Sequence, residues 1–238
     1  MKRISAAPEE ADIVELSHEA RGVARLDGKA VFVEDALPGE RVVLRRVRRG
    51  RTFDEAVLES VLSASADRVA PACPHYGTCG GCALQHLAPG AQLAFKQAQL
   101  LGNLARLGGV EPQRLLEPLT GPVWGYRRRA RLGIKLVPRK GRVLVGFRER
   151  SAPYVADLHG CRVLAPPLDA LIDPLAVLVG SLSIAARVPQ AEAAVADNGC
   201  ALVLRVLDPP TSDDLDRLLK FGSRHGVRRR VPPFRRDP

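Results

Sequence analysis

Three cysteines lie within ten residues of one another and have a spacing suited to binding a metal. Cys73, Cys79 and Cys82 follow the pattern C-x5-C-x2-C, and the two residues between the last pair are glycines. Glycine removes the steric cost of a tight turn, so this pair can direct two thiolates at one centre. A cuboidal iron–sulfur cluster takes four thiolates, and Cys161 is the natural fourth candidate.

Spacing alone leaves the identity of the metal open. Structural zinc sites usually offer two short cysteine knuckles, whereas only one C-x2-C is present here. A histidine could replace one thiolate, the candidates being His75, His86 and His159. Four reduced cysteines that merely pack are a weaker reading for a polar, glycine-rich loop. The fifth cysteine, Cys200, begins an apolar strand and is predicted to be a buried structural thiol.

Positive charge is concentrated in one stretch of thirty residues. The chain has a formal net charge of +10, and the segment 121–150 contains ten basic residues and a single acid, Glu149. A polyanionic partner explains such a concentration, because lysine and arginine release counterions from phosphates. A solvated face usually mixes both signs. The predicted RNA-binding residues are Arg127, Arg128, Arg129, Arg131 and Lys135.

The elements that would position these residues are mainly strands. Between residues 10 and 63, five short apolar runs separated by glycine-containing turns predict a small five-stranded barrel, a shape often used to grip nucleic acid. Six arginines cluster on its fourth strand and the following turn: Arg41, Arg45, Arg46, Arg48, Arg49 and Arg51. Acidic residues elsewhere leave this region near neutral.

After the cysteine loop, apolar spacing predicts a helix over residues 89–109 that packs on the core. Alternation predicts a strand over 130–137 that pairs with 142–147 and presents Arg131 and Lys135 on its polar side. Further helices are expected over 166–182 and 213–222, the last capped by Thr211-Ser212, and a strand over 201–207. The arginine- and proline-rich residues 227–238 are predicted to be a disordered tail.

Composition restricts the class of protein. The hydrophobic fraction of 46% allows a packed core, which aliphatic residues must fill because aromatics are only 4%. No apolar run is long enough to span a membrane, and the first residues lack the apolar region of a signal peptide. A cytoplasmic protein is therefore expected, and cysteines there bind metal more often than they form disulfides.

With these residues in view, the chain resembles the bacterial 23S rRNA (uracil-C5)-methyltransferase family. The matching residues are the four cysteines, the phrase WGYRRRAR over 124–131 and the phrase VGFR over 145–148. The resemblance runs from about residue 10 to about residue 226. It implies a TRAM-type barrel, a 4Fe-4S cluster on Cys73, Cys79, Cys82 and Cys161 in place of zinc, and 23S rRNA as the structured RNA partner of a monomer.

The resemblance also fixes the expected organisation. The fold class is mainly β with some α: a five-stranded OB-like barrel (1–65), a cysteine loop and helix (66–110), an α+β central domain (111–226) and the tail (227–238). The family's reaction uses S-adenosylmethionine, a cysteine thiolate that adds to C6 of uracil and a base that removes the C5 proton. Its catalytic cysteine, base and cofactor loop lie in a C-terminal Rossmann-like domain.

No glycine-rich loop between a buried strand and a helix occurs in this sequence. The Rossmann-like methyltransferase domain is therefore predicted to be absent and the chain to be inactive, with no catalytic or cofactor-binding residue assigned. The expected function is that of an RNA-binding, iron–sulfur-containing portion of an rRNA methyltransferase. The alternatives are a standalone RNA-binding module with a cluster or zinc, and a zinc-stabilised interaction protein without an RNA role.

Overall fold

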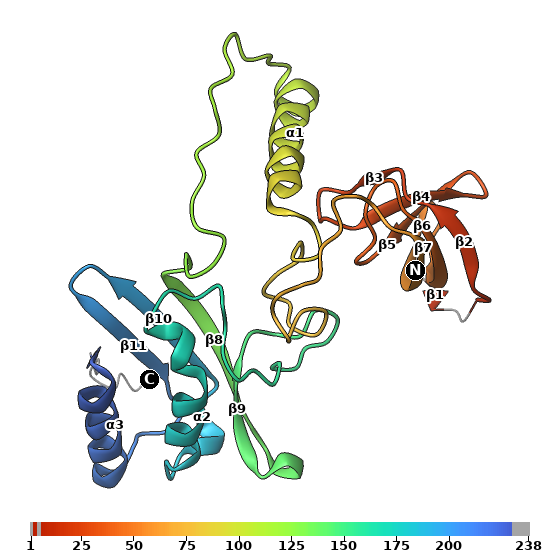
Figure 1. Cartoon of the computed structure of the whole chain (residues 1–238). Helices are drawn as coiled ribbons and strands as arrows, with labels where there is room; N and C mark the ends of the chain where they lie inside the picture. Colours follow the sequence, from red (N-terminus) through yellow and green to blue (C-terminus); the bar gives the residue numbers. More distant parts are fainter. Residues whose placement is uncertain (1, 4–5, 230–238) are drawn as a thin grey trace. The chain divides into compact units, whose positions relative to one another are not determined.

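The computed structural model describes residues 2–3 and 6–229, which form two compact units (Figure 1). One unit contains residues 1–74 and 82–119, and the other contains residues 75–81 and 120–238. Residues 75–81 of the cysteine loop thus belong to the second unit, and Cys73 and Cys82 belong to the first. The division into the four parts 1–65, 66–110, 111–226 and 227–238 stays a prediction.

The first unit is built on one sheet of seven strands with the order β1-β6-β7-β5-β4-β3, and β2 also pairs with β6. The strands are β1 (Lys2–Arg3), β2 (Glu9–Asp12), β3 (Glu15–Leu16), β4 (Gly22–Leu26), β5 (Lys29–Val33), β6 (Arg41–Arg49) and β7 (Phe53–Ser63). The count exceeds the five predicted because the first strand is divided between β2 and β3 and because β1 is added at the edge.

The segment 9–16 closes this sheet around its core. Its first half, β2, pairs with β6, and its second half, β3, pairs with β4 at the opposite end of the strand order. The side chains inside are small and aliphatic, as the low aromatic content requires. They are Ala11, Ile13, Ala24, Val31, Val33, Ala36, Val42, Leu44 and Ala56.

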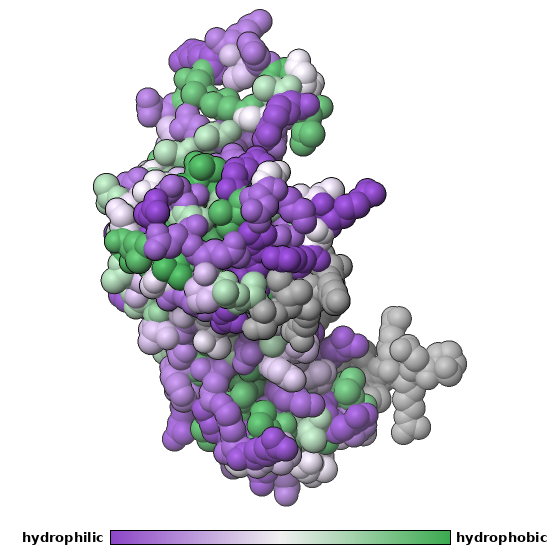
Figure 2. Space-filling view, turned by 90° about the vertical axis from the view of Figure 1, so that its right-hand side faces the viewer, coloured by the Kyte–Doolittle hydropathy of each residue, from purple (hydrophilic) through white to green (hydrophobic). Residues whose placement is uncertain are grey.

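Helix α1 (Pro89–Gly108) has no buried residue, so the prediction that it packs on the core is wrong for most of its length. Only its first turns contact a small cluster, through Ala91 and Phe95. Leu107 and Leu119 are among the most exposed apolar side chains in the first unit. In Figure 2, green, hydrophobic residues lie among purple ones at the top of the view, where α1 is drawn.

The second unit is a sheet of five strands with the order β12-β11-β10-β8-β9, antiparallel except for the parallel pair β11 and β12. Its strands are β8 (Arg129–Val137), β9 (Arg142–Gly146), β10 (Gln190–Ala196), β11 (Gly199–Arg205) and β12 (Val227–Arg229). Its helices are α2 (Ile172–Gly180) and α3 (Ser212–His225), with short 3-10 turns η1 (Pro138–Lys140), η2 (Leu168–Ala170) and η3 (Ala185–Arg187).

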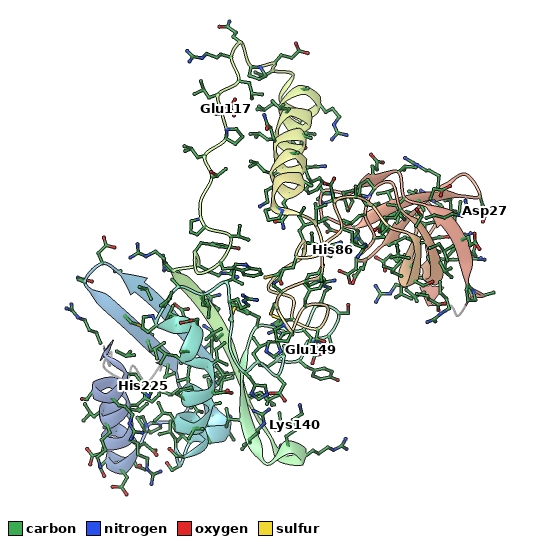
Figure 3. The ribbon with its side chains drawn as sticks, in the orientation of Figure 1. Asp27, His86, Glu117, Lys140, Glu149 and His225 are labelled. Carbon is green, nitrogen blue, oxygen red and sulfur yellow. The ribbon has the colours of Figure 1, made fainter. Side chains whose placement is uncertain are left out.

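The helices cover one face of this sheet. Side chains of α2 and the alternate side chains Ala130, Leu132 and Ile134 of β8 are buried in one core, against which Leu218 and Phe221 of α3 also pack. The predicted hairpin of β8 and β9 is confirmed: Val137 pairs with Arg142, and Lys140 lies at its end (Figure 3). No helix among residues 2–3 and 6–229 is long and apolar enough to cross a lipid bilayer.

Two boundaries differ from the predictions. The helix predicted over residues 166–182 is divided, because residues Leu168–Ala170 form the 3-10 turn η2 and α2 begins only at Ile172. The tail predicted from residue 227 is wrong for its first three residues, which form β12 by pairing with Cys200, Ala201 and Leu202 of β11. Residues 230–238 lie outside the described residues.

The start of α3 is held by a buried carboxylate. Asp214, 1% exposed, accepts hydrogen bonds from the backbone and hydroxyl of Ser183 and from the backbone of Thr211, whose hydroxyl caps the helix in return. The bond from the Ser183 hydroxyl is the main reason that the pKa of Asp214 is lowered to about 2, and burial opposes it. The predicted cap at Thr211 is thus confirmed.

We expect Asp214→Ala to lower the free energy of unfolding by about 2 kcal/mol at neutral pH, because it removes the cap and several charge-assisted bonds. Asp216→Ala, an exposed acid of the same helix, should change it by less than about 0.5 kcal/mol. Because folding lowers the pKa of Asp214, its carboxylate stabilises the folded protein at pH values above the ordinary pKa of 3.8. This stabilisation is lost as the pH falls towards 2. Denaturant titrations at pH 7 and pH 2.5 should therefore show the gap closing in acid; equal effects of both variants at pH 7 would contradict the assignment.

Candidate metal centre and nucleic-acid interface

The middle of the cysteine loop is paired with the chain that follows β9. Cys79 and Glu149 form an antiparallel bridge, and Glu149 lies at this crossing in Figure 3. The backbone N–H of Gly80 donates to the carbonyl of Arg148 at 2.9 Å, and that of Arg150 donates to the carbonyl of Thr78 at 2.9 Å. The loop is therefore a short strand-like extension of the second unit.

The two glycines between Cys79 and Cys82 are favoured by close contacts within this unit. A Cβ added at Gly80 would lie 3.0 Å from the carbonyl oxygen of Arg148, and one at Gly81 would lie 3.2 Å from the Phe147 ring and 3.4 Å from the sulfur of Cys79. The glycines thus permit the C-x2-C turn to seat against the unit.

Cys161 is placed in the same unit as Cys79. Both are half-buried and pack against the same hydrophobic core. The backbone N–H of His159 also approaches the Nε2 atom of His75 at 3.3 Å, which brings the segment before Cys161 beside the beginning of the loop. Two of the four predicted ligands therefore share one environment.

Cys73 and Cys82 belong to the first unit, where both are half-buried and the N–H of Cys73 donates to the side-chain carbonyl of Gln85 at 3.2 Å. Within the described part of the chain, no group of three or more His, Cys, Asp or Glu side chains is arranged to hold a metal ion. The cysteine thiolates are suitable ligands for an iron–sulfur cluster, and Gly80 and Gly81 allow the turn between Cys79 and Cys82. The four-cysteine cluster stays a prediction.

Cys200 is confirmed as a buried thiol. It is part of the core of the second unit, and burial raises its pKa. A thiol with a raised pKa has a small reactive thiolate fraction at neutral pH, which fits a structural role.

The basic stretch enters the sheet through β8. The backbone N–H groups of Gly125 and Arg127 donate to the carbonyls of Arg162 and Val163, directly after Cys161. From Arg129 onward the strand alternates between exposed and buried side chains. Arg129, Arg131 and Lys135 are therefore on the exposed face, as the alternation predicts.

The other predicted RNA-binding residues have local partners. The guanidinium of Arg127 lies over the Phe147 ring, 5.1 Å from its centroid. Arg128 is exposed and donates to Asp197 at 2.7 Å, and Arg131 contacts Glu192 at 3.2 Å. The structure thus puts Arg129, Arg131 and Lys135 on one surface and holds Arg127 and Arg128 at the start of β8.

Strand β10 was not predicted from the sequence. It carries Glu192 beside Arg131 and pairs with both β8 and β11 in the sheet. Its sequence, QAEAAVA, is rich in alanine, which has weak strand propensity. The turn residues Asp197 and Asn198 before Gly199 were the available hairpin signal. Through this hairpin the exposed side chain of Arg205 joins the face of β8.

The chain is similar to a known domain and to known methyltransferases. Residues 9–45 match the TRAM domain model, within the closed sheet of the first unit. The chain is 50% identical over 216 residues to a 23S rRNA (uracil(1939)-C(5))-methyltransferase RlmD of Bordetella parapertussis, covering 91% of this chain and 46% of the relative. It is 49% identical over 226 residues to the protein of that name from Alkalilimnicola ehrlichii, covering 95% of this chain and 51% of the relative.

The resemblance to the bacterial 23S rRNA (uracil-C5)-methyltransferase family is therefore confirmed, and the chain spans about half the length of the curated relatives it matches. Among solved structures, a tRNA (uracil-54, C5)-methyltransferase of Pyrococcus abyssi in complex with S-adenosyl-L-homocysteine matches with a TM-score of 0.60 and 20% identity. The match covers 87% of this chain and 48% of that one, and it shows similarity of fold.

The predictions that a Rossmann-like methyltransferase domain is absent and that the chain is inactive for this reason are wrong. The relatives that match nine tenths of the chain are methyltransferases, and so is the solved structure that matches it. A missing glycine-rich strand–loop–helix in one stretch of sequence says nothing about segments that such relatives carry outside the matched half.

Proposed function

We propose that this protein acts in the S-adenosylmethionine-dependent methylation of a uracil C5 position in rRNA and that the described residues hold the RNA. The observation that carries the proposal is the identity of about 50% to rRNA (uracil-C5)-methyltransferases over nine tenths of the chain. The exposed arginines of β8 are consistent with it, because an RNA partner requires positive charge that remains accessible.

The residues proposed to contact RNA are Arg127, Arg128, Arg129, Arg131 and Lys135. On β8, the side chains of Arg129, Arg131 and Lys135 can neutralise phosphates and so set the register of the RNA. The guanidinium of Arg127 lies over the Phe147 ring, and we propose that it contacts a base or a phosphate of the RNA. Bound S-adenosylmethionine would supply the methyl group; the role of the described residues is to bind and orient the polynucleotide.

We further propose that Cys73, Cys79, Cys82 and Cys161 ligate a 4Fe-4S cluster. Support comes from the C-x5-C-x2-C spacing, from the glycines that allow the turn between Cys79 and Cys82, and from the packing of Cys79 and Cys161 against one core. Such a cluster would cross-link the cysteine loop to Cys161 in the segment between β9 and η2, since thiolate ligation ties distant parts of a chain to one centre.

The function is tested most directly in rRNA. Disruption of the gene that encodes this chain is expected to remove one 5-methyluridine from 23S rRNA, and restoration of the gene is expected to return it. The measurement is mass spectrometry of rRNA nuclease fragments, which also locates the modified uracil. An unchanged set of 5-methyluridines after disruption would exclude the proposed function.

A further inference from the structure

One face of the second unit's sheet carries no helix. Side chains of β8, β10, β11 and β12 alternate, and most of those that point away from the helices are exposed, while Gly133, Gln190 and Ala194 are half-buried. We call this surface the open face. Its members are Arg129, Arg131 and Lys135 of β8, Glu192 and Ala194 of β10, Ala201, Val203 and Arg205 of β11, and Arg228 of β12.

Strand register places residues from distant parts of the sequence on this face together. Arg131 is opposite Glu192, which is opposite Val203, and Arg205 follows two residues later on the same side of β11. From strand and residue spacing, the backbones of Arg131 and Arg205 are about 12 Å apart. Long arginine side chains at this distance can contact one ligand.

Charge on the open face is strongly unbalanced. Five members are basic, and Glu192 is the single acid among them. Glu192 accepts from Arg131 and from the side-chain amide of Gln190, so one arginine is partly neutralised. Arg129 and Arg205 are exposed and have no ion pair among those found in the described residues, which distinguishes them from most arginines of the first unit.

The rest of the open face is small and apolar. Ala201 is exposed and Val203 is 42% exposed, and Val155 packs over Gly133 at the β8 end of the row that contains Arg205. Guanidinium groups that surround small side chains suit an extended polyanion, because its phosphates can approach and neutralise the charges.

We propose that the open face is an RNA-binding surface, on which Arg205 is a contact that extends the site from β8 across β10 to β11. The inference rests on the proposed function and names where on the fold the RNA lies. Arg205 is separated from the basic stretch by more than fifty residues, and β10 brings the two together. Glu192 limits the affinity by holding Arg131 and by repelling phosphate.

The test compares single substitutions in the full chain with a 23S rRNA fragment, with binding measured at several salt concentrations. Arg205→Ala and Arg131→Ala should each weaken binding on the order of five-fold at 0.15 M salt and reduce the slope against log salt by about one. Arg224→Ala, an exposed arginine on α3, which packs on the opposite face, is the matched control and should bind as the parent does. Glu192→Gln should bind more tightly than the parent.

The outcomes separate this proposal from the function. RNA binding that is unchanged in Arg205→Ala, or weakened equally in Arg224→Ala, would overturn the open face as the site while leaving an RNA function in place. If 23S rRNA keeps its full set of 5-methyluridines after the gene is disrupted, the proposed function is excluded instead. Thermal unfolding of each variant verifies that an exposed substitution has left the fold intact.

Discussion

Arg46→Ala is expected to lower the free energy of unfolding of the first unit by about 3–5 kcal/mol, because it breaks the buried ion pair of Arg46 with Asp54 from one side. The Arg46 residue is 3% exposed and its partner Asp54 is 0% exposed. Its guanidinium donates to Asp54 at 3.1 Å and to Glu9 and Asp27 at 2.7 Å each. Removing it leaves the Asp54 carboxylate inside the sheet with the partly exposed Lys29, 3.4 Å away, as its cationic partner.

The pKa shifts of Arg46 and Asp54 favour the charged form of both groups. The pKa of Arg46 is raised, mainly by its hydrogen bond to Glu9, although burial opposes the shift. For Asp54, burial alone would raise the pKa, but bonds from the Gly50 N–H, from Arg46 and from Lys29 outweigh it and the pKa is lowered. The network therefore stays charged at neutral pH, and the loss of one partner is costly.

Arg45→Ala is the matched control. Arg45 precedes Arg46 on β6 and pairs with Glu59, but its side chain is more than one third exposed. An exposed pair contributes less than about 1 kcal/mol, so this variant should unfold close to the parent. Denaturant titration followed by circular dichroism measures both. Similar losses for the two substitutions would show that burial of the network is not what stabilises the unit.

The arginine cluster on β6 is largely paired with acids inside the first unit. In sequence, six arginines stand close together. In the sheet, acids from other strands reach Arg41, Arg45, Arg46 and Arg48, as the strand pairings of β6 with β2 and β7 require. Charge that is near in sequence can be compensated by residues that only the fold brings close.

Elements with strong local signals were predicted well. The β8–β9 hairpin follows from alternation and a glycine turn, and α3 begins at its predicted cap because Thr211 and Asp214 satisfy each other's backbone donors. Signals failed where tertiary pairing decides. An alanine-rich segment becomes β10 because it fits between β8 and β11, and residues 227–229 become β12 because β11 offers a free edge.

The candidate site divides in the same way. The cysteine spacing and the basic residues of β8 are visible in the sequence, since each is a local pattern. The extension to Arg205 is not, because it depends on the register of three strands. The sequence likewise shows Gly80 and Gly81 but not the Phe147 ring and Arg148 carbonyl that leave little room for a larger residue there.

Cys161→Ser is expected to lose most of the iron that the parent contains. Protein purified without oxygen should be brown and hold about four irons, and a cluster left with three thiolates is under-ligated. The measurements are iron and sulfide per chain and the visible absorption spectrum. Cys161 is distant in sequence from the other three cysteines, so this substitution tests whether the segment before β10 takes part.

Cys200→Ala is the matched control, because it removes a thiol from the same unit at a position inside the core. It should retain the parent's iron and colour, even if its thermal stability is lower. Equal iron in Cys161→Ser and the parent would show that Cys161 is not a ligand, and the cluster would then have to rest on the loop alone. A colourless parent containing one zinc would exclude the cluster, because zinc has no visible absorption and needs no sulfide.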